Sequence, residues 1–236
     1  MPQSAFSFEV ETAPHPLSDG TFHPDLYEVR PISFRRAKRL IVWGHYTHSL
    51  TKGRYSFGMF RGQQLVGAAV YGQPSGRNVA QSFWEGGDEQ NTLELLRLFV
   101  MDGTGKNAET WFMARCHRAL PKEVRLLVAY SAPGAGHHGG CYQGGNWLFL
   151  GESQSGQNYY YTDTAGDYVN KRIPWQYGPR NGLPHTEGES AEILELTRVE
   201  EPRKMVYALP LDRKVIRLLK RDVLPYPKPD RELVTP

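Results

Sequence analysis

The 236-residue sequence contains only two cysteines, Cys116 and Cys141, and they do not form a CxxC pair. A disulfide-stabilised scaffold and a cysteine-rich zinc site are therefore both disfavoured. No apolar run approaches the roughly 18 residues that a membrane span requires. The N-terminus also lacks the charged-then-apolar order of a secretory signal. These absences predict a protein that makes no membrane contact and works in the reducing cytoplasm.

The net charge is only +3, which by itself does not imply nucleic-acid binding, but the basic residues are unevenly distributed. One cluster lies at 35–39, and a second, diluted by acidic residues, lies at 198–221. Such stripes can follow a phosphate backbone or can form solvated helix faces, and both interpretations stay open. The abundant aromatic residues likewise suit either base stacking or an ordinary core.

Hydrophobic patterning predicts a single α/β domain with a mixed sheet over residues 1–236. Ser33 caps a first helix that directs Ala37, Leu40 and Ile41 to one face. A second helix is capped by Asn107 and directs Trp111, Ala114, Cys116 and Leu120 toward the core. Strands are expected at 55–60, 64–71, 93–100, 124–130 and 146–150. Residues 1–30 are predicted to be an irregular arm. Residues 152–236 are predicted to be an irregular, partly basic extension with an amphipathic helix near 213–221.

The block at residues 93–151 carries the side chains best suited to chemistry. A loop begins at Ser131, where a strand ends, and six glycines between Ser131 and Asn146 allow a ligand to approach the backbone closely. Arg97 interrupts an otherwise apolar strand and therefore needs an anionic partner. That partner is either a carboxylate of the protein, Glu94 or Glu109, or a ligand phosphate. A metal site at His137 and His138 with His45 or His48 is less favoured, because adjacent histidines do not easily face one ion.

Four stretches of this block, taken in order, resemble the phage Mom family, and the resemblance runs through residues 40–151 and weakly through 204–209. The stretches are Glu94-Leu-Leu-Arg97-Leu-Phe-Val, Lys106-Asn107-Ala-Glu109-Thr-Trp-Phe, Ala129-Tyr-Ser131-Ala-Pro and Gly136-His137-x-Gly-x-x-Tyr142-Gln143-x-x-Asn146-Trp147-x-x-x-Gly151. Mom-like proteins are phage enzymes with a GNAT-like (N-acetyltransferase) fold. They convert adenine in DNA to N6-carbamoylmethyladenine, which hides phage DNA from host restriction.

The resemblance implies a GNAT-like mixed-sheet acyltransferase fold, double-stranded DNA as the partner and the bacterial host cytoplasm as the location. The acyl donor stays open between glycyl-tRNA, which would give the basic extension a purpose, and an acyl-CoA. Iron-assisted chemistry is open as well. An adenine inside a duplex must be extruded before it reacts. Tyr46, Trp147 or the tyrosines at 159–161 would stack on it, although core packing is the commoner fate of a residue such as Trp147.

The resemblance also assigns roles to individual residues. The catalytic positions are His45, Tyr46, Arg97, Ser131, Ala132 and Tyr142. The turn residues Gly105, Lys106 and Asn107 are expected to contact the donor. Gln143, Asn146 and His137 are expected to contact the substrate.

Ala132 departs from the family pattern, in which an aspartate follows the serine. If that carboxylate is the general base or holds the acceptor amine, this chain is impaired, is an engineered variant, or uses another group such as Asp102 or Glu109. Two other functions remain open. A coenzyme-A-dependent GNAT enzyme acting on a small amine or a protein is disfavoured, because the turn at 103–107 lacks the basic first residue of a pyrophosphate site. A non-catalytic DNA-binding relative is made more credible by Ala132.

Overall fold

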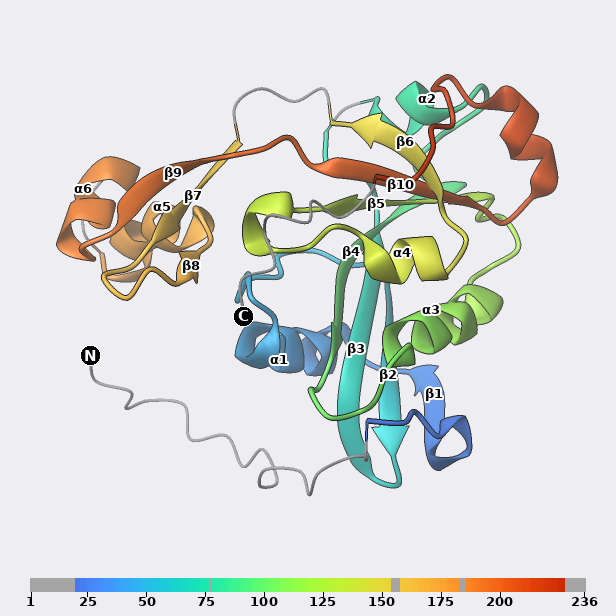
Figure 1. Ribbon diagram of the computed structural model, residues 1–236, viewed down its shortest axis with the longest axis horizontal. Coiled ribbons are helices and arrows are strands. Elements are labelled where there is room, and N and C mark those ends of the chain that lie inside the picture. Colours follow the sequence, from blue (N-terminus) through green and yellow to red (C-terminus); the bar gives the residue numbers. More distant parts are fainter. Residues whose placement is uncertain (1–19, 77, 154–157, 183–185, 228–236) are drawn as a thin grey trace.

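The computed structural model describes residues 20–76, 78–153, 158–182 and 186–227. Its main sheet has the strand order β1-β2-β3-β4-β5-β10-β6, and a smaller sheet has the order β8-β7-β9 (Figure 1). The main-sheet strands are β1 (Tyr27–Pro31), β2 (Tyr55–Arg61), β3 (Gln64–Gly72), β4 (Thr92–Val100), β5 (Leu126–Ser131), β6 (Leu148–Glu152) and β10 (Met205–Pro210). All neighbouring pairs are antiparallel except β4 and β5, which are parallel. The expected mixed-sheet α/β fold is confirmed.

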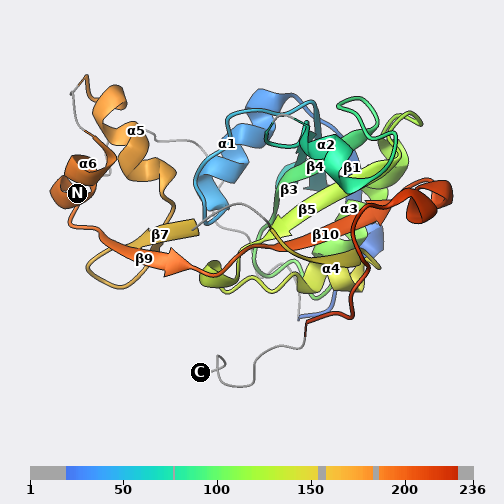
Figure 2. The ribbon, with the colours of Figure 1, turned by 90° about the horizontal axis from the view of Figure 1, so that it is seen from above.

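Helices cover both faces of this sheet because successive residues of each strand point to opposite sides. Ala68 and Val70 of β3 pack with α1 (Phe34–Gly44), whereas Ala69 and Tyr71 belong to the core that includes α3 (Ala108–Ala119). The short helices are α2 (Val79–Phe83) and α4 (Gly140–Gly144). Figure 2 shows α1 and α3 on opposite sides of the main sheet.

Two local predictions about the helices have different outcomes. Ser33 caps α1 as expected, since its side chain accepts a hydrogen bond from the Arg36 backbone N–H. Asn107 does not cap α3 with its side chain, and it adopts a left-handed backbone with φ 67° instead. The predicted core face of α3 is also partly wrong, because Ala114 is exposed while Phe112 and Met113 are buried.

The main sheet opens between β4 and β5. The two strands pair over three residues only, from Thr92 opposite Leu126 to Glu94 opposite Val128. A register shift then interrupts the pairing of β4 with β3, between Val70 and Tyr71. A bulge of this kind bends a strand and increases its local twist. The rest of β4 therefore diverges from β5 and leaves a gap at the carboxyl ends of both strands.

The expectation of irregular termini is wrong for the residues that the structure describes. Within the expected arm, β1 forms the edge of the main sheet, while residues 1–19 lie outside the described residues. In the expected extension, β10 inserts between β5 and β6. The basic segment near 213–221 forms a 3-10 helix, Arg213–Leu218, rather than an α-helix. Residues 228–236 of the expected extension lie outside the described residues.

Residues 158–201 form an accessory unit beside the main sheet. Its elements are β7 (Asn158–Thr162), β8 (Tyr168–Val169), α5 (Arg172–Arg180), α6 (Glu187–Ile193) and β9 (Thr197–Glu201). Figure 1 shows the unit at one side of the molecule, connected directly to the main sheet by the run from β9 into β10. The unit is therefore an insertion between β6 and β10.

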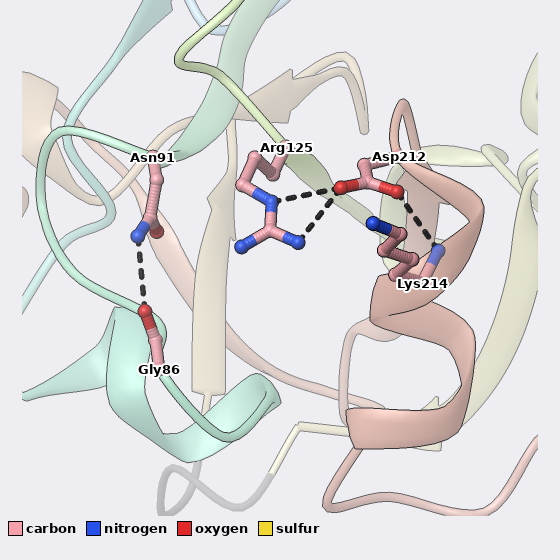
Figure 3. A network of polar contacts seen from close by, with 5 residues as sticks. All are labelled: Gly86, Asn91, Arg125, Asp212 and Lys214. Atoms are coloured by element: carbon pink, nitrogen blue, oxygen red, sulfur yellow. Dashed lines mark hydrogen bonds and ion pairs between the residues drawn. The ribbon is translucent and has the colours of Figure 1, made fainter.

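Polar contacts hold the chain after β10 against the rest of the fold (Figure 3). Arg125, just before β5, donates two hydrogen bonds to Asp212 Oδ2, at 3.0 and 2.7 Å. Asp212 Oδ1 accepts from the Lys214 backbone N–H and so caps the 3-10 helix. Nearby, Asn91 donates to the Gly86 carbonyl and closes the turn that leads into β4. These contacts tie both central strands to the loops at their starting ends.

Candidate active site

A cleft of about 1060 Å³ occupies the gap between β4 and β5. Seven of the residues predicted for the site line it, and they come from the end of α1, from β4 and from the loop after β5. These are His45, Tyr46, Arg97, Ser131, Ala132, His137 and Tyr142. The cleft therefore lies where ligands usually bind in open α/β sheets, at the carboxyl ends of the central strands.

Arg97 lies in this cleft without a carboxylate partner. Its Nε donates to Thr47 Oγ1 at 3.0 Å and to the Ser49 carbonyl at 2.9 Å, and its Nη1 donates to the Leu96 carbonyl. Among the described residues no Asp or Glu oxygen lies within ion-pair distance of the guanidinium. Burial lowers the pKa of Arg97, so its charge is incompletely solvated. An anion that enters the cleft would relieve this cost.

His45 is held neutral beside Arg97. Burial and, secondarily, the charge of Arg97 lower its pKa to about 3. The Thr47 backbone N–H donates to His45 Nδ1 at 3.1 Å, so this nitrogen is the acceptor and the ring proton resides on Nε2. The same Thr47 also binds Arg97 through its hydroxyl. One threonine thus fixes the orientation of both side chains.

Tyr46 is the centre of an aromatic cluster on the cleft wall. Its ring lies 4.4 Å from that of His45, 4.6 Å from that of His137 and 5.4 Å from that of Tyr168. Tyr168 in turn stacks on Tyr160 at 4.9 Å. Burial raises the pKa of Tyr46 and lowers that of His137, so both groups are uncharged at neutral pH. A row of neutral rings of this kind can stack on a planar base.

The loop after β5 lines the cleft with backbone as well as side chains. Ser131 is buried, and its hydroxyl donates to the His137 carbonyl. Ala132 is buried too, and its carbonyl accepts hydrogen bonds from the Ala135 and His137 amides. The loop is thus closed on itself. It presents a methyl group at position 132, where the resemblance implies a carboxylate.

The remaining predicted substrate residues are not brought into the cleft. Gln143 donates to the His138 carbonyl and to the Tyr207 hydroxyl, so it links the loop after β5 to β10. Asn146 is exposed and has a left-handed backbone, with φ 57°. Tyr142 does line the cleft, and burial raises its pKa well above the ordinary value. Trp147 is a core residue, only 1% exposed, and is unavailable for stacking on a base.

The predicted donor-binding turn also lies outside the cleft. A side chain at Gly105 would contact the Phe22 backbone at 2.7 Å, and the Lys106 amide donates to the Gly20 carbonyl. The turn is therefore packed against the segment before β1 rather than open to a ligand. Of the residues to which the resemblance assigns a role, Arg97, Ser131 and Tyr142 line the same cleft and Asn107 does not. The carboxylates named as substitutes, Asp102 and Glu109, line the cleft.

Two ionisable residues line the cleft that were not predicted as site residues, Glu94 and Lys204. Glu94 lies where β4 leaves β5, and its Oε2 accepts a hydrogen bond from the Ser75 amide at 3.0 Å. Burial raises its pKa. Lys204 precedes β10, and burial lowers its pKa, while the charge of Glu201 acts in the opposite direction. The sequence pointed to Lys204 only through the basic cluster at 198–221 and the weak resemblance at 204–209, and Glu94 was considered only as a partner for Arg97.

The accessory unit completes the rim of the cleft. Tyr168, Asn170, Lys171 and Arg172 all line it. The sequence offered no pattern for these residues, because they lie far along the chain from β4 and β5. Together with Arg97 and Lys204, the two cations of this rim make this side of the cleft positive.

No three His, Cys, Asp or Glu side chains of the described residues are grouped so as to hold a metal ion. The His45 and His137 rings each contact the Tyr46 ring, at 4.4 and 4.6 Å. In the same part of the chain, no helix is long and apolar enough to cross a membrane.

Comparison with known proteins identifies relatives. The methylcarbamoylase Mom of Escherichia phage Mu is 26% identical over 131 residues, which cover 54% of this chain and 54% of that protein. This chain thus matches about half the length of that relative. Among solved structures, an N-acetyltransferase from Staphylococcus aureus is similar with a TM-score of 0.44 and 14% identity, over 79% of this chain and 99% of that one. A ribosomal-protein-alanine N-acetyltransferase from Brucella melitensis gives 0.42 and 14%, over 78% and 99%.

The family match extends over almost all of the described chain. The Mom protein family matches residues 26–228, from the edge strand β1 to beyond the last 3-10 helix. It therefore includes both sides of the cleft and the accessory unit as well. The chain belongs to the Mom protein family.

Proposed function

We propose that this protein modifies adenine in phage DNA by transferring an acyl-type group within the β4–β5 cleft. The observation that carries the proposal is family membership across residues 26–228, which contain every residue of the cleft. The name of the phage Mu relative, methylcarbamoylase, indicates the group transferred. A cleft with an arginine that has no carboxylate partner, neutral aromatic rings and a half-buried carboxylate suits transfer to a weakly basic amine.

A two-stage route gives the carbamoylmethyl product from a glycyl ester donor. Adenine N6 attacks the ester carbonyl, the donor alcohol leaves, and the N6 proton passes to a base. The free glycyl amine then attacks the ring carbon that bears N6 and forms a five-membered spiro intermediate. Cleavage of the original bond between that carbon and N6 leaves the ring attached to a carbamoylmethyl amine. The second stage is an isomerisation, so it requires proton transfers and no oxidant.

Each residue of the cleft has a defined part in this route. Arg97 binds the oxyanion that develops on the attacked carbonyl, since its charge has no carboxylate partner among the described residues. Glu94 accepts the proton that leaves N6. Tyr46 stacks on the extruded base, supported by His45 and Tyr168. This assignment uses Glu94 in the place of an aspartate at position 132.

Transfer of an acyl group from coenzyme A to a small amine is less well supported than transfer to DNA. The turn at 103–107 would have to admit a pyrophosphate, but Gly105 packs directly against the Phe22 backbone. The cations on the cleft rim come instead from α5 and from the start of β10.

Nucleoside mass spectrometry tests the proposal directly. DNA from bacteria that express the protein is expected to contain deoxyadenosine carrying one carbamoylmethyl group. DNA from cells expressing the Arg97→Met variant serves as the control. Unmodified DNA in the presence of folded wild-type protein would contradict the proposal. Purified protein that carries bound coenzyme A would instead support the small-amine function.

Restoring a carboxylate at position 132 has a definite expected result. Ala132 lines the cleft, so Ala132→Asp would add a second carboxylate proton acceptor to it. If Glu94 already removes the proton, Ala132→Asp should change adenine modification by less than about threefold, whereas a missing base predicts a gain of about a hundredfold or more. Ala132→Asn provides the uncharged control. A large gain that is specific to aspartate would remove Glu94 from the proposed role.

A further inference from the structure

Trp175 is an unusually exposed tryptophan beside the cleft. Its side chain is 61% exposed, more than any other large hydrophobic residue that the structure describes. It lies on α5, whose Pro174 and Gly178 are buried against the rest of the accessory unit. The helix is therefore anchored by one face and presents Trp175 on another. A tryptophan that is exposed on an anchored helix is available to a binding partner, and tryptophan is enriched at interfaces.

The position of Trp175 relative to the cleft follows from helix geometry. Arg172 lines the cleft and precedes Trp175 by three residues, so the two side chains lie on the same face of α5, about 5 Å apart along the helix. The unit is fixed to the cleft by Tyr168, whose ring contacts Tyr46. Trp175 thus lies about one helical turn from Arg172, which lines the cleft.

The charge around α5 fits a phosphate backbone. Lys171 and Arg172 begin the helix and Arg180 ends it. Lys171 and Arg198 of β9 both contact the ring of Tyr159. The other helix of the unit, α6, is different in charge. Its acidic residues are Glu187, Glu189 and Glu192. A nucleic acid would therefore approach the unit along α5 and avoid α6.

Extrusion of a base leaves a gap in the duplex that an inserted side chain can fill. Proteins that distort DNA often insert apolar wedges between base steps, and cations on both sides hold the flanking phosphates. Trp175 offers such a wedge, with Lys171 and Arg172 on the side of the cleft and Arg180 on the other side. The wedge and the stacking site at Tyr46 belong to parts of the fold that touch each other.

We propose that α5 docks on duplex DNA and that Trp175 inserts into the space vacated when adenine is extruded into the cleft. This inference rests on the proposed function, because it requires adenine in a duplex as the substrate. It goes beyond that function by assigning base extrusion to the accessory unit rather than to the cleft. It predicts that Trp175 is needed only when the adenine must be separated from a partner base.

Two DNA substrates separate wedging from catalysis. One carries adenine opposite thymine, and the other carries the same adenine opposite an abasic site. In bacterial extract, which supplies the donor, Trp175→Ala should modify the paired adenine at least about tenfold more slowly than wild type, as expected for loss of one stacking contact. It should modify the unpaired adenine within about twofold of wild type. Trp175→Phe should retain much of the activity on paired adenine.

Ile193→Ala is the matched control, since Ile193 is 51% exposed in the same unit but lies on the acidic helix α6. It should leave both rates unchanged. Equal activity of Trp175→Ala and wild type on paired adenine would overturn the inference, as would equal losses on both substrates. If wild type modifies neither substrate, the proposed function itself fails.

A binding measurement tests the insertion of Trp175 into DNA without any chemical reaction. Duplex DNA with 2-aminopurine at the target position becomes more fluorescent when that base unstacks. Wild-type protein should raise this fluorescence on binding, and Trp175→Ala should bind with little increase. An equal increase for both proteins would assign base extrusion to other residues.

Discussion

Replacing Arg97 with lysine is expected to reduce adenine modification at least about a hundredfold, the usual cost of removing one donor to a developing oxyanion. Lysine keeps the charge but has no planar fork, so it cannot hold Thr47 and Ser49 while also facing a ligand. Arg97→Met should be no more active. The measurement is the fraction of modified deoxyadenosine in DNA from cells that contain equal amounts of each protein.

Arg118→Lys is the control for this loss, because Arg118 is exposed on α3 and does not line the cleft. It should leave modification unchanged. Thermal unfolding of the Arg97 variants separates a catalytic defect from a folding defect. Full activity of a folded Arg97→Lys protein would show that the guanidinium does not bind the oxyanion.

Replacing Glu94 with glutamine is expected to lower modification by about two orders of magnitude or more and to change its pH dependence. A base must be ionised to accept a proton, so wild-type activity should fall as the pH falls through the pKa of Glu94. Burial raises that pKa, and the loss should therefore begin at higher pH than for an exposed glutamate. The residual activity of Glu94→Gln should not show this fall of activity at acidic pH, which we call the acid limb. Rates in buffered extract over a range of pH measure both effects.

The Glu94→Gln variant should be less active but more stable than wild type at neutral pH. The pKa of Glu94 is higher in the folded protein than in the unfolded chain, because burial disfavours the ionised carboxylate. Ionisation of Glu94 therefore lowers the free energy of unfolding. Stability is therefore lost as the pH rises through the folded-state pKa. Glu94→Gln should unfold at a higher temperature than wild type at neutral pH, and at a similar temperature in acid.

Glu123→Gln, on an exposed loop, is the matched control and should alter neither rate nor stability. A purely structural role for Glu94 predicts lower stability of Glu94→Gln together with lower activity. An unchanged acid limb in Glu94→Gln would transfer the role of base to another group of the cleft, such as Asp102 or Glu109.

Much of the cleft could be predicted because its residues lie next to local signals. Arg97 stands out as a charge in an apolar strand, and Ser131 marks the end of another strand. The first helix, the hairpin β2–β3 and the central strands each follow from hydrophobic periodicity and from turn residues close in sequence. These elements form wherever the rest of the chain goes, which is why their patterns were informative.

The predictions that failed depended on contacts between distant segments. Asn107 looked like a side-chain cap, but the packing of Gly105 on Phe22 sets the backbone of that turn. Gln143 and Asn146 lie in the same loop as Tyr142, yet of these three residues Tyr142 alone lines the cleft. Sequence spacing gives no information about which side of an irregular loop faces a ligand.

The sequence by itself determined the mixed α/β class, the central strands and the family to which the chain belongs. Only the tertiary structure decided that residues 158–201 form a unit on the cleft rim, and that Lys171, Arg172 and Lys204 join Arg97 there. The physical reason is the placement of β10, which pairs with β5 from more than seventy residues away along the chain. That pairing brings the accessory unit to the cleft, and no local pattern in the sequence encodes it.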